Sequence, residues 1–144
     1  MLRKLVMAII LLSIFTVSAE AQSPPKIEIF NINKGKVIKE LPMQEDVQLE
    51  VENIISGITD IYRGFEPIPK KGHMVRIPLD PAVEVNNEWF HDLVSEVIVI
   101  FPEYENPLLM VFNEENNMPY FWTFEGSVDA LLKKLNLKLK GMTK

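Results

Sequence analysis

The sequence predicts an α+β domain in which an N-terminal hairpin and a three-strand C-terminal meander form an antiparallel sheet, with helices packed on both faces. One observation is a helical repeat of apolar residues between Pro42 and Gly64. The other is that residues 97–101, 108–112 and 120–124 are apolar at nearly every position. Strands of that kind are covered on both faces, so we expect a helix on each side of the sheet.

The first elements of the domain are expected to form a hairpin. Ile27 and Ile29 alternate with Glu28, which is the period of a half-buried strand. The segment Asn33–Lys36 supplies the turn, and a second strand begins with Val37.

A long helix is expected between Pro42 and Gly64. Proline suits the first turn of a helix, and glycine suits the left-handed residue after the last turn. Glu45 and Asp46 lie where the positive end of the helix dipole favours acidic side chains. The apolar residues of one helix face follow helical spacing: Val47, Val51, Ile54, Ile55, Ile58, Tyr62 and Phe65.

The middle of the chain is rich in proline. Residues 73–77 have a strand pattern, and Pro78 and Pro81 suggest that this strand lies at an edge of the sheet. Residues 88–95 fit both the helical and the strand period. We interpret them as a short helix or turn that leads into a strand over residues 96–101.

The C-terminal part predicts the meander and a final helix. Polar segments 103–107 and 113–117 are short enough to join neighbouring antiparallel strands. Ser127 is expected to cap a helix whose apolar face comprises Val128, Leu131, Leu132 and Leu135. The order of helix, sheet and helix resembles the layering of profilin-like domains. This resemblance concerns the layers alone, so it implies a fold and no function.

The first 21 residues have the pattern of a cleaved secretory signal peptide. Arg3 and Lys4 precede an apolar run, Leu5–Val17, and an A-x-A cleavage site ends at Ala21. The run is shorter than the roughly 20 residues that span a bilayer, so no stable membrane anchor is expected after cleavage. The chain thus divides into a signal peptide (1–21), a mobile spacer (22–25), one globular domain (26–139) and a basic tail (140–144).

The composition excludes several classes of protein. The chain has no cysteine, so it has no disulfide, thiol nucleophile, cysteine-based metal site or lipidated cysteine. Acidic residues outnumber basic ones, 20 to 15, which argues against a nucleic-acid partner. An exported domain without disulfides fits a bacterial cell envelope or medium, so we expect a secreted or extracytoplasmic bacterial protein.

One cluster of residues could support an enzyme. Glu88, His91 and Asp92 would share one side of a helix, where they could hold a divalent ion or assist hydrolysis. The chain has only one Glu-x-x-His, however, and none of the common catalytic motifs. The sequence therefore predicts neither a metal site nor a cofactor.

Aromatic side chains provide the candidate binding residues. Tyr120, Trp122 and Phe124 alternate along a strand and therefore share one face. If these side chains are exposed, the stripe would form a platform for a peptide or a sugar. If they are buried, the stripe belongs to the core. The apolar neighbouring strands favour the second interpretation. The binding candidates are Trp89, His91, Tyr120 and Trp122.

Two polar segments have alternative interpretations. Asn113–Asn117 is rich in oxygen ligands but lacks the spacing of an EF-hand loop, which favours a hairpin connection over a calcium site. Lysines near the C-terminus either contact anionic wall polymer or lipid headgroups, or complement a helix dipole: Lys133, Lys134, Lys138, Lys140 and Lys144.

These observations favour a small exported, non-enzymatic binding or regulatory domain that recognises a protein or peptide partner. One alternative is an envelope hydrolase or metal-dependent enzyme that uses Glu88, His91 and Asp92. Another is a homodimeric structural envelope protein whose exposed apolar strands close against a second copy. The sequence does not identify the partner or the oligomeric state.

Overall fold

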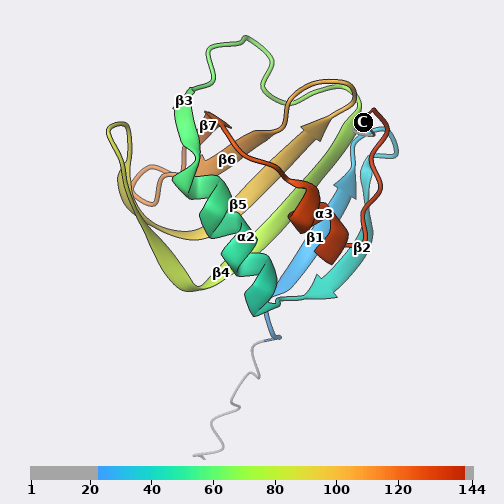
Figure 1. The fold of residues 1–144 in the computed structure, drawn as a ribbon, viewed down its shortest axis with the longest axis horizontal. Coiled ribbons are helices and arrows are strands. Elements are labelled where there is room, and N and C mark those ends of the chain that lie inside the picture. Colours follow the sequence, from blue (N-terminus) through green and yellow to red (C-terminus); the bar gives the residue numbers. More distant parts are fainter. Residues whose placement is uncertain (1–22, 142–144) are drawn as a thin grey trace, which may run out of the picture.

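The protein is described by a computed structural model that covers residues 23–141. Within this range the chain forms one seven-stranded antiparallel sheet and two helices (Figure 1). The elements, in chain order, are β1 (Lys26–Asn31), β2 (Lys36–Pro42), α2 (Glu45–Ser56), β3 (Ile58–Ile61), β4 (Gly72–Asn86), β5 (His91–Pro102), β6 (Leu108–Phe112), β7 (Pro119–Phe124) and α3 (Asp129–Lys134). The predicted signal peptide and the last residues of the basic tail lie outside the described residues.

The strand order is β2-β1-β4-β5-β6-β7-β3. The N-terminal hairpin is confirmed, because β1 and β2 pair in antiparallel fashion. The meander is confirmed as well, since β5 pairs with β6 and β6 with β7. Neither α2 nor α3 has the length and apolar content of a helix that crosses a bilayer.

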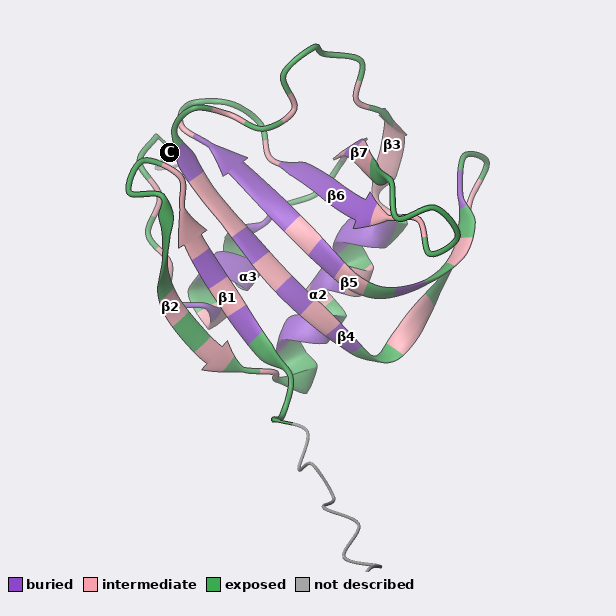
Figure 2. Ribbon diagram, turned by 180° about the vertical axis from the view of Figure 1, so that it is seen from behind, coloured by how far each residue is buried: buried purple, intermediate pink, exposed green. Residues whose placement is uncertain are grey.

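The prediction of helices on both faces of the sheet is wrong, and with it the α+β, profilin-like layering. The molecule is mostly antiparallel sheet, and α2 and α3 lie together on one face (Figure 1). From behind, the strands are in front and both helices lie beyond them (Figure 2). Apolar residues of both helices join one core with that face of the sheet, for example Val51 of α2, Leu131 of α3 and Val99 of β5.

The long helix ends earlier than predicted. It stops at Ser56, and Gly57 leads directly into β3, which pairs with β7 at the edge of the sheet. A side chain at Gly57 would collide with the Glu125 carbonyl, so glycine allows this close approach. Phe65, which continues the helical spacing in the sequence, is fully exposed (104 %) in the following loop.

The proline-bearing strand is central instead of at an edge. β4 lies between β1 and β5, but its pairing with β1 ends at Arg76, and its register with β5 shifts between Pro78 and Val83. Pro78 therefore needs no amide hydrogen for a bond to β1, which explains how a central strand accommodates it.

Residues 88–95 contain no helix. Asn87 Oδ1 accepts hydrogen bonds from the amides of Trp89 and Phe90, which closes a turn, and β5 begins at His91. The final helix forms where it was predicted but is shorter, and Ser127 is not its cap: Val128 is the N-cap residue, without a side-chain hydrogen bond, and Leu135 is the C-cap. The amide of Asp129 still donates to Ser127 Oγ.

Candidate binding surface

The sheet face opposite the helices, called here the open face, begins on its β1 side with charged residues. Arg76 lies between two glutamates: Nε is 2.9 Å from Glu28 Oε2, and Nη1 is 2.6 Å from Glu96 Oε2. The hydrogen bond from Arg76 lowers the pKa of Glu28. The hydrogen bonds to Glu28 and Glu96 raise the pKa of Arg76. All three side chains are partly exposed, so this network defines a polar margin more than it stabilises the fold.

The middle of the open face is apolar. In the register across the sheet, Arg76 is followed by Ile98, Met110 and Phe121 on the next three strands. Three of the apolar side chains are buried, and their partly exposed neighbours pack around them. We call this set the apolar patch: Met74, Ile98, Ile100, Leu108, Met110, Phe112 and Phe121, with Tyr62 at its end.

A groove of about 460 Å³ continues the apolar patch at one end of the sheet. It lies between the loop after β3 and the turn that joins β5 to β6. We call it the proline groove, and it is lined by Tyr62, Glu66, Pro67, Pro69, Pro102, Tyr104, Glu105, Asn106, Leu108 and Thr123. Because Tyr62 and Leu108 belong to both sets, the groove and the patch form one continuous surface.

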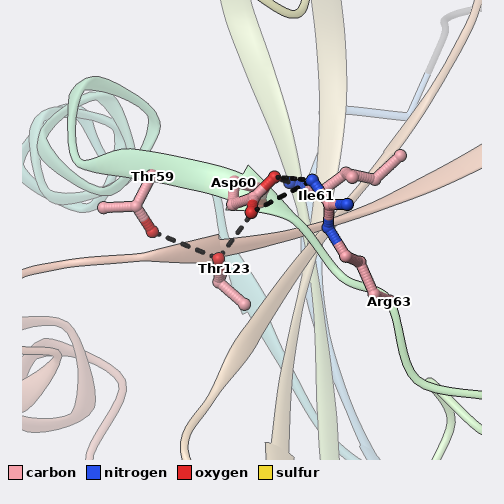
Figure 3. Close-up of polar contacts among 5 residues, drawn as sticks. All are labelled: Thr59, Asp60, Ile61, Arg63 and Thr123. Carbon is pink, nitrogen blue, oxygen red and sulfur yellow. Dashed lines mark hydrogen bonds and ion pairs between the residues drawn. The ribbon is translucent and has the colours of Figure 1, made fainter.

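Hydrogen bonds at the end of β3 fix where the loop leaves the sheet (Figure 3). Asp60 Oδ1 accepts from the Ile61 amide at 2.7 Å, and the same carboxylate pairs with Arg63. The hydrogen bond from the Ile61 amide has the largest effect in lowering the pKa of Asp60, and the hydrogen bond from Arg63 lowers it further. Thr123 Oγ1 donates to the Asp60 carbonyl at 3.1 Å and lies 3.1 Å from Thr59 Oγ1. The groove wall is therefore attached to both β3 and β7.

Tyr104 has an unusual conformation in this surface. Its φ angle is 65°, in the left-handed region, and it is 74 % exposed. A non-glycine residue there carries a cost of roughly 1–2 kcal/mol, and asparagine or glycine is more common. The ring lies against the backbone of Gly141, where a side chain would collide with it, and its other side is open to solvent.

The proline groove is acidic. Glu66 and Glu105 are exposed at its rim, and no lysine or arginine of the described residues lines it. Lys70 and Lys71 line the adjoining pocket, which shares both glutamates. Proline and tyrosine rings form much of its walls, together with Asn106, Leu108 and Thr123. This arrangement can bind a segment that presents apolar side chains and a positive charge.

The structure separates the four binding candidates predicted from the sequence. Trp122 is buried (2 %) and Tyr120 is half-buried, and both belong to the core on the helix-covered face. Their rings pack with Phe90, whose centroid is 6.0 Å from that of Trp122. Trp122 Nε1 has no hydrogen-bond partner among the described residues. Trp89 (40 % exposed) and His91 lie at the β4–β5 turn, at the opposite end of β5 from the groove.

The residues of the enzyme alternative do not converge. His91 and Asp92 are successive residues of β5, so their side chains point to opposite faces of the sheet. Among residues 23–141, no group of three or more histidine, aspartate or glutamate side chains could hold a metal ion. In the polar loop, Asn113 Oδ1 accepts from the amides of Glu115 and Asn116, as in a hairpin connection.

The C-terminal lysines have different surroundings. Lys134 Nζ lies 3.0 Å from Glu50 Oε1, which ties α3 to α2. Lys133 is exposed on α3. Lys138 and Lys140, in contrast, line a pocket together with His73 and Lys34 of the β1–β2 turn.

The residues of the proline groove were missed in the sequence. Pro67 and Pro69 looked like part of a connection, and Tyr104 lay in a segment interpreted as a polar turn. One signal in the sequence could have indicated this site: a tyrosine stands in segment 103–107, where a turn favours small polar residues.

Comparison with protein families, with curated proteins and with solved structures finds no match to this chain.

Proposed function

We propose that this protein is a small exported, non-enzymatic binding domain that holds a peptide segment of a partner protein in the proline groove and along the apolar patch. Tyr104 is the observation that carries the proposal. A strained, exposed tyrosine adds nothing to the core, whereas a preordered aromatic ring gives a large contact area at little cost in conformational entropy.

The charge of the groove defines the chemistry of the partner. A bound segment would place apolar side chains against Pro67, Pro69 and Leu108, and a lysine or arginine beside Glu66 or Glu105. The contact area continues onto the apolar patch, whose partly exposed side chains are typical of a binding surface.

A selection of random displayed peptides on the immobilised protein tests this proposal. We expect enriched sequences that combine apolar residues with at least one basic residue. Affinities of the selected peptides, measured by fluorescence anisotropy, should fall when both Glu66 and Glu105 are changed to glutamine, and their salt dependence should weaken.

Trp89→Ala is the matched control. Trp89 is also an exposed aromatic residue in a turn, but the length of β5 separates it from the groove. Peptide affinity should therefore stay within about twofold of the wild type in this variant and in His91→Ala. Selection of no common sequence, or equal loss of affinity in Trp89→Ala, would overturn the proposal.

A homodimer is the competing occupant of the same surface. In that case sedimentation would give twice the monomer mass, and the wild-type protein would not bind the displayed peptides until the dimer dissociated. That result would reject the peptide partner and favour the structural alternative.

Export is part of the proposal and has a separate test. Expression of the full sequence in a bacterium should yield protein outside the cytoplasm whose N-terminus is Gln22, as read by intact-mass analysis. Protein that keeps residues 1–21 and stays in the cytoplasm would contradict export.

A further inference from the structure

A second pocket, separate from the proline groove, lies at the end of the sheet where the β1–β2 turn meets the chain after α3. Its volume is about 350 Å³. Its walls come from the β1–β2 turn, the start of β4, the end of β5 and residues 138–140. It shares only Pro102 with the proline groove.

The charged groups of this pocket are mostly positive. Lys34, Lys138 and Lys140 line it, against a single carboxylate, Glu103. This excess is unusual in a protein with more acidic than basic residues. The two C-terminal lysines line the same pocket as Lys34 although about 100 residues separate them in the sequence, so the fold gathers positive charge here.

His73 is the histidine of this pocket, and an imidazole can change charge between pH 5 and pH 8. Its Nε2 lies 3.0 Å from Asn31 Nδ2. Because an amide NH₂ only donates, Nε2 is the acceptor and the neutral ring carries its proton on Nδ1. Asn31 cannot simply turn its oxygen to the ring, since Asn31 Oδ1 already accepts from the Lys34 amide at 2.9 Å.

We propose that this pocket binds a small ligand bearing a phosphate-like or carboxylate oxyanion, held by Lys34, Lys138 and Lys140, and that binding tightens as the pH falls because His73 becomes protonated. The ligand is free in solution or is the exposed end of a larger molecule. The size of the pocket fits a small organic anion and excludes a folded partner.

The direction of the pH dependence follows from the groups that face His73. Burial lowers the pKa of His73, Glu103 opposes this effect, and Lys34 adds to it. Lys138 and Lys140 face the same pocket. A bound anion offsets the positive charges and favours the imidazolium, so it must raise the pKa of His73. By linkage, the protonated protein then binds the anion more tightly.

Calorimetric titration with sulfate tests the proposal, because sulfate keeps its charge between pH 5.5 and 7.5. We expect saturable binding that tightens at least threefold from pH 7.5 to pH 5.5. The double variant Lys34→Gln/Lys138→Gln should weaken it at least tenfold. Lys133→Gln, which removes an exposed lysine outside the pocket, should change it less than twofold.

The ring proton of His73, followed by NMR in the wild-type protein, gives a readout that needs no variant. Sulfate should raise the pH midpoint of its titration, and His73→Gln should remove the pH dependence of sulfate binding. A midpoint that sulfate does not move, or equal weakening by Lys133→Gln, would overturn the proposal.

A vesicle assay distinguishes the source of the oxyanion. If vesicles containing phosphatidylglycerol compete with sulfate, the anion belongs to a lipid headgroup; if they do not, it is a soluble ligand. If vesicles bind to the protein without competing with sulfate, they contact lysines outside the pocket, and the oxyanion of the pocket is again a soluble ligand. None of these results depends on the peptide selection.

Discussion

The two faces of the same sheet differ in what covers them. On one face, α2 and α3 bury Val75, Val97 and Leu109 completely. On the other face, the neighbouring residues Arg76, Ile98 and Met110 have no helix above them, and only their own neighbours shield the apolar ones. Adjacent residues of one strand therefore have different surroundings: one side packs beneath the helices, and the other forms the apolar patch, which we propose binds a partner.

Truncating an apolar side chain should destabilise the protein far more on the helix-covered face than on the open face. Leu109→Ala removes a fully buried side chain beneath the helices and should lower the free energy of unfolding by about 3 kcal/mol. Ile98→Ala deletes a side chain of similar size from the partly exposed face and should cost about 1 kcal/mol. Urea unfolding measures both. Equal losses would mean that the two faces are equally covered.

The next effect concerns how the helix layer is attached to the sheet. Gln48 of α2 is buried; its Oε1 accepts from the Asp80 amide at 2.9 Å, and its Nε2 donates to the Pro81 carbonyl at 3.0 Å. Gln48→Ala leaves both backbone groups without this partner and should cost about 2 kcal/mol. Glu52→Gln, which alters only a third contact of the same side chain, is the control and should cost less than about 0.5 kcal/mol. If Gln48→Ala destabilised the protein as little as the control does, these hydrogen bonds would not help to hold α2 against the sheet.

Tyr104→Gly tests whether the exposed ring beside the proline groove serves binding or stability. Glycine adopts the observed φ of 65° without strain, which offsets its entropic cost in the unfolded chain. The free energy of unfolding should therefore stay within about 1 kcal/mol of the wild type. The affinity for a selected peptide should fall at least tenfold, about 1.4 kcal/mol, because the ring is lost. A large loss of stability with unchanged peptide affinity would mean that Tyr104 stabilises the fold and does not bind the peptide.

The smallest effect is electrostatic. The pKa of Glu28 is below its ordinary value of 4.5 because of Arg76, so this pair stabilises the protein above pH 4.5 and the contribution is lost as the pH falls further. Between pH 6 and pH 3.5 the wild type should lose up to about 1 kcal/mol more stability than Arg76→Leu, with exposure limiting the difference. Identical pH profiles in urea unfolding would show that the pair is fully screened.

Local patterns in the sequence predicted the hairpin, the meander and the start of α2, because alternation and helical spacing act over short distances. They did not predict where α2 ends. Ile58 and Tyr62 continue the helical spacing, but the pairing of β3 with β7 determines their conformation, and β7 lies some 60 residues further along the chain.

The position of the helices could not be predicted either. Segments that are apolar on both faces led to the expectation of two covers, yet Ile100, Leu108 and Met110 are buried by side chains of the sheet itself. The proline groove depends on the meeting of residues 62–69 with residues 102–108, and no local pattern encodes that contact. For the same reason, the approach of Lys138 to Lys34 was not visible in the sequence.

Amide chemical-shift mapping with a selected peptide tests most directly whether the open side of the molecule is the binding side. We expect perturbed amides to cluster at residues 62–69 and 104–108 and to extend to the middle of β6 and β7, while those of α2 and α3 stay unchanged. Perturbations centred on the helices or on the β4–β5 turn would contradict it.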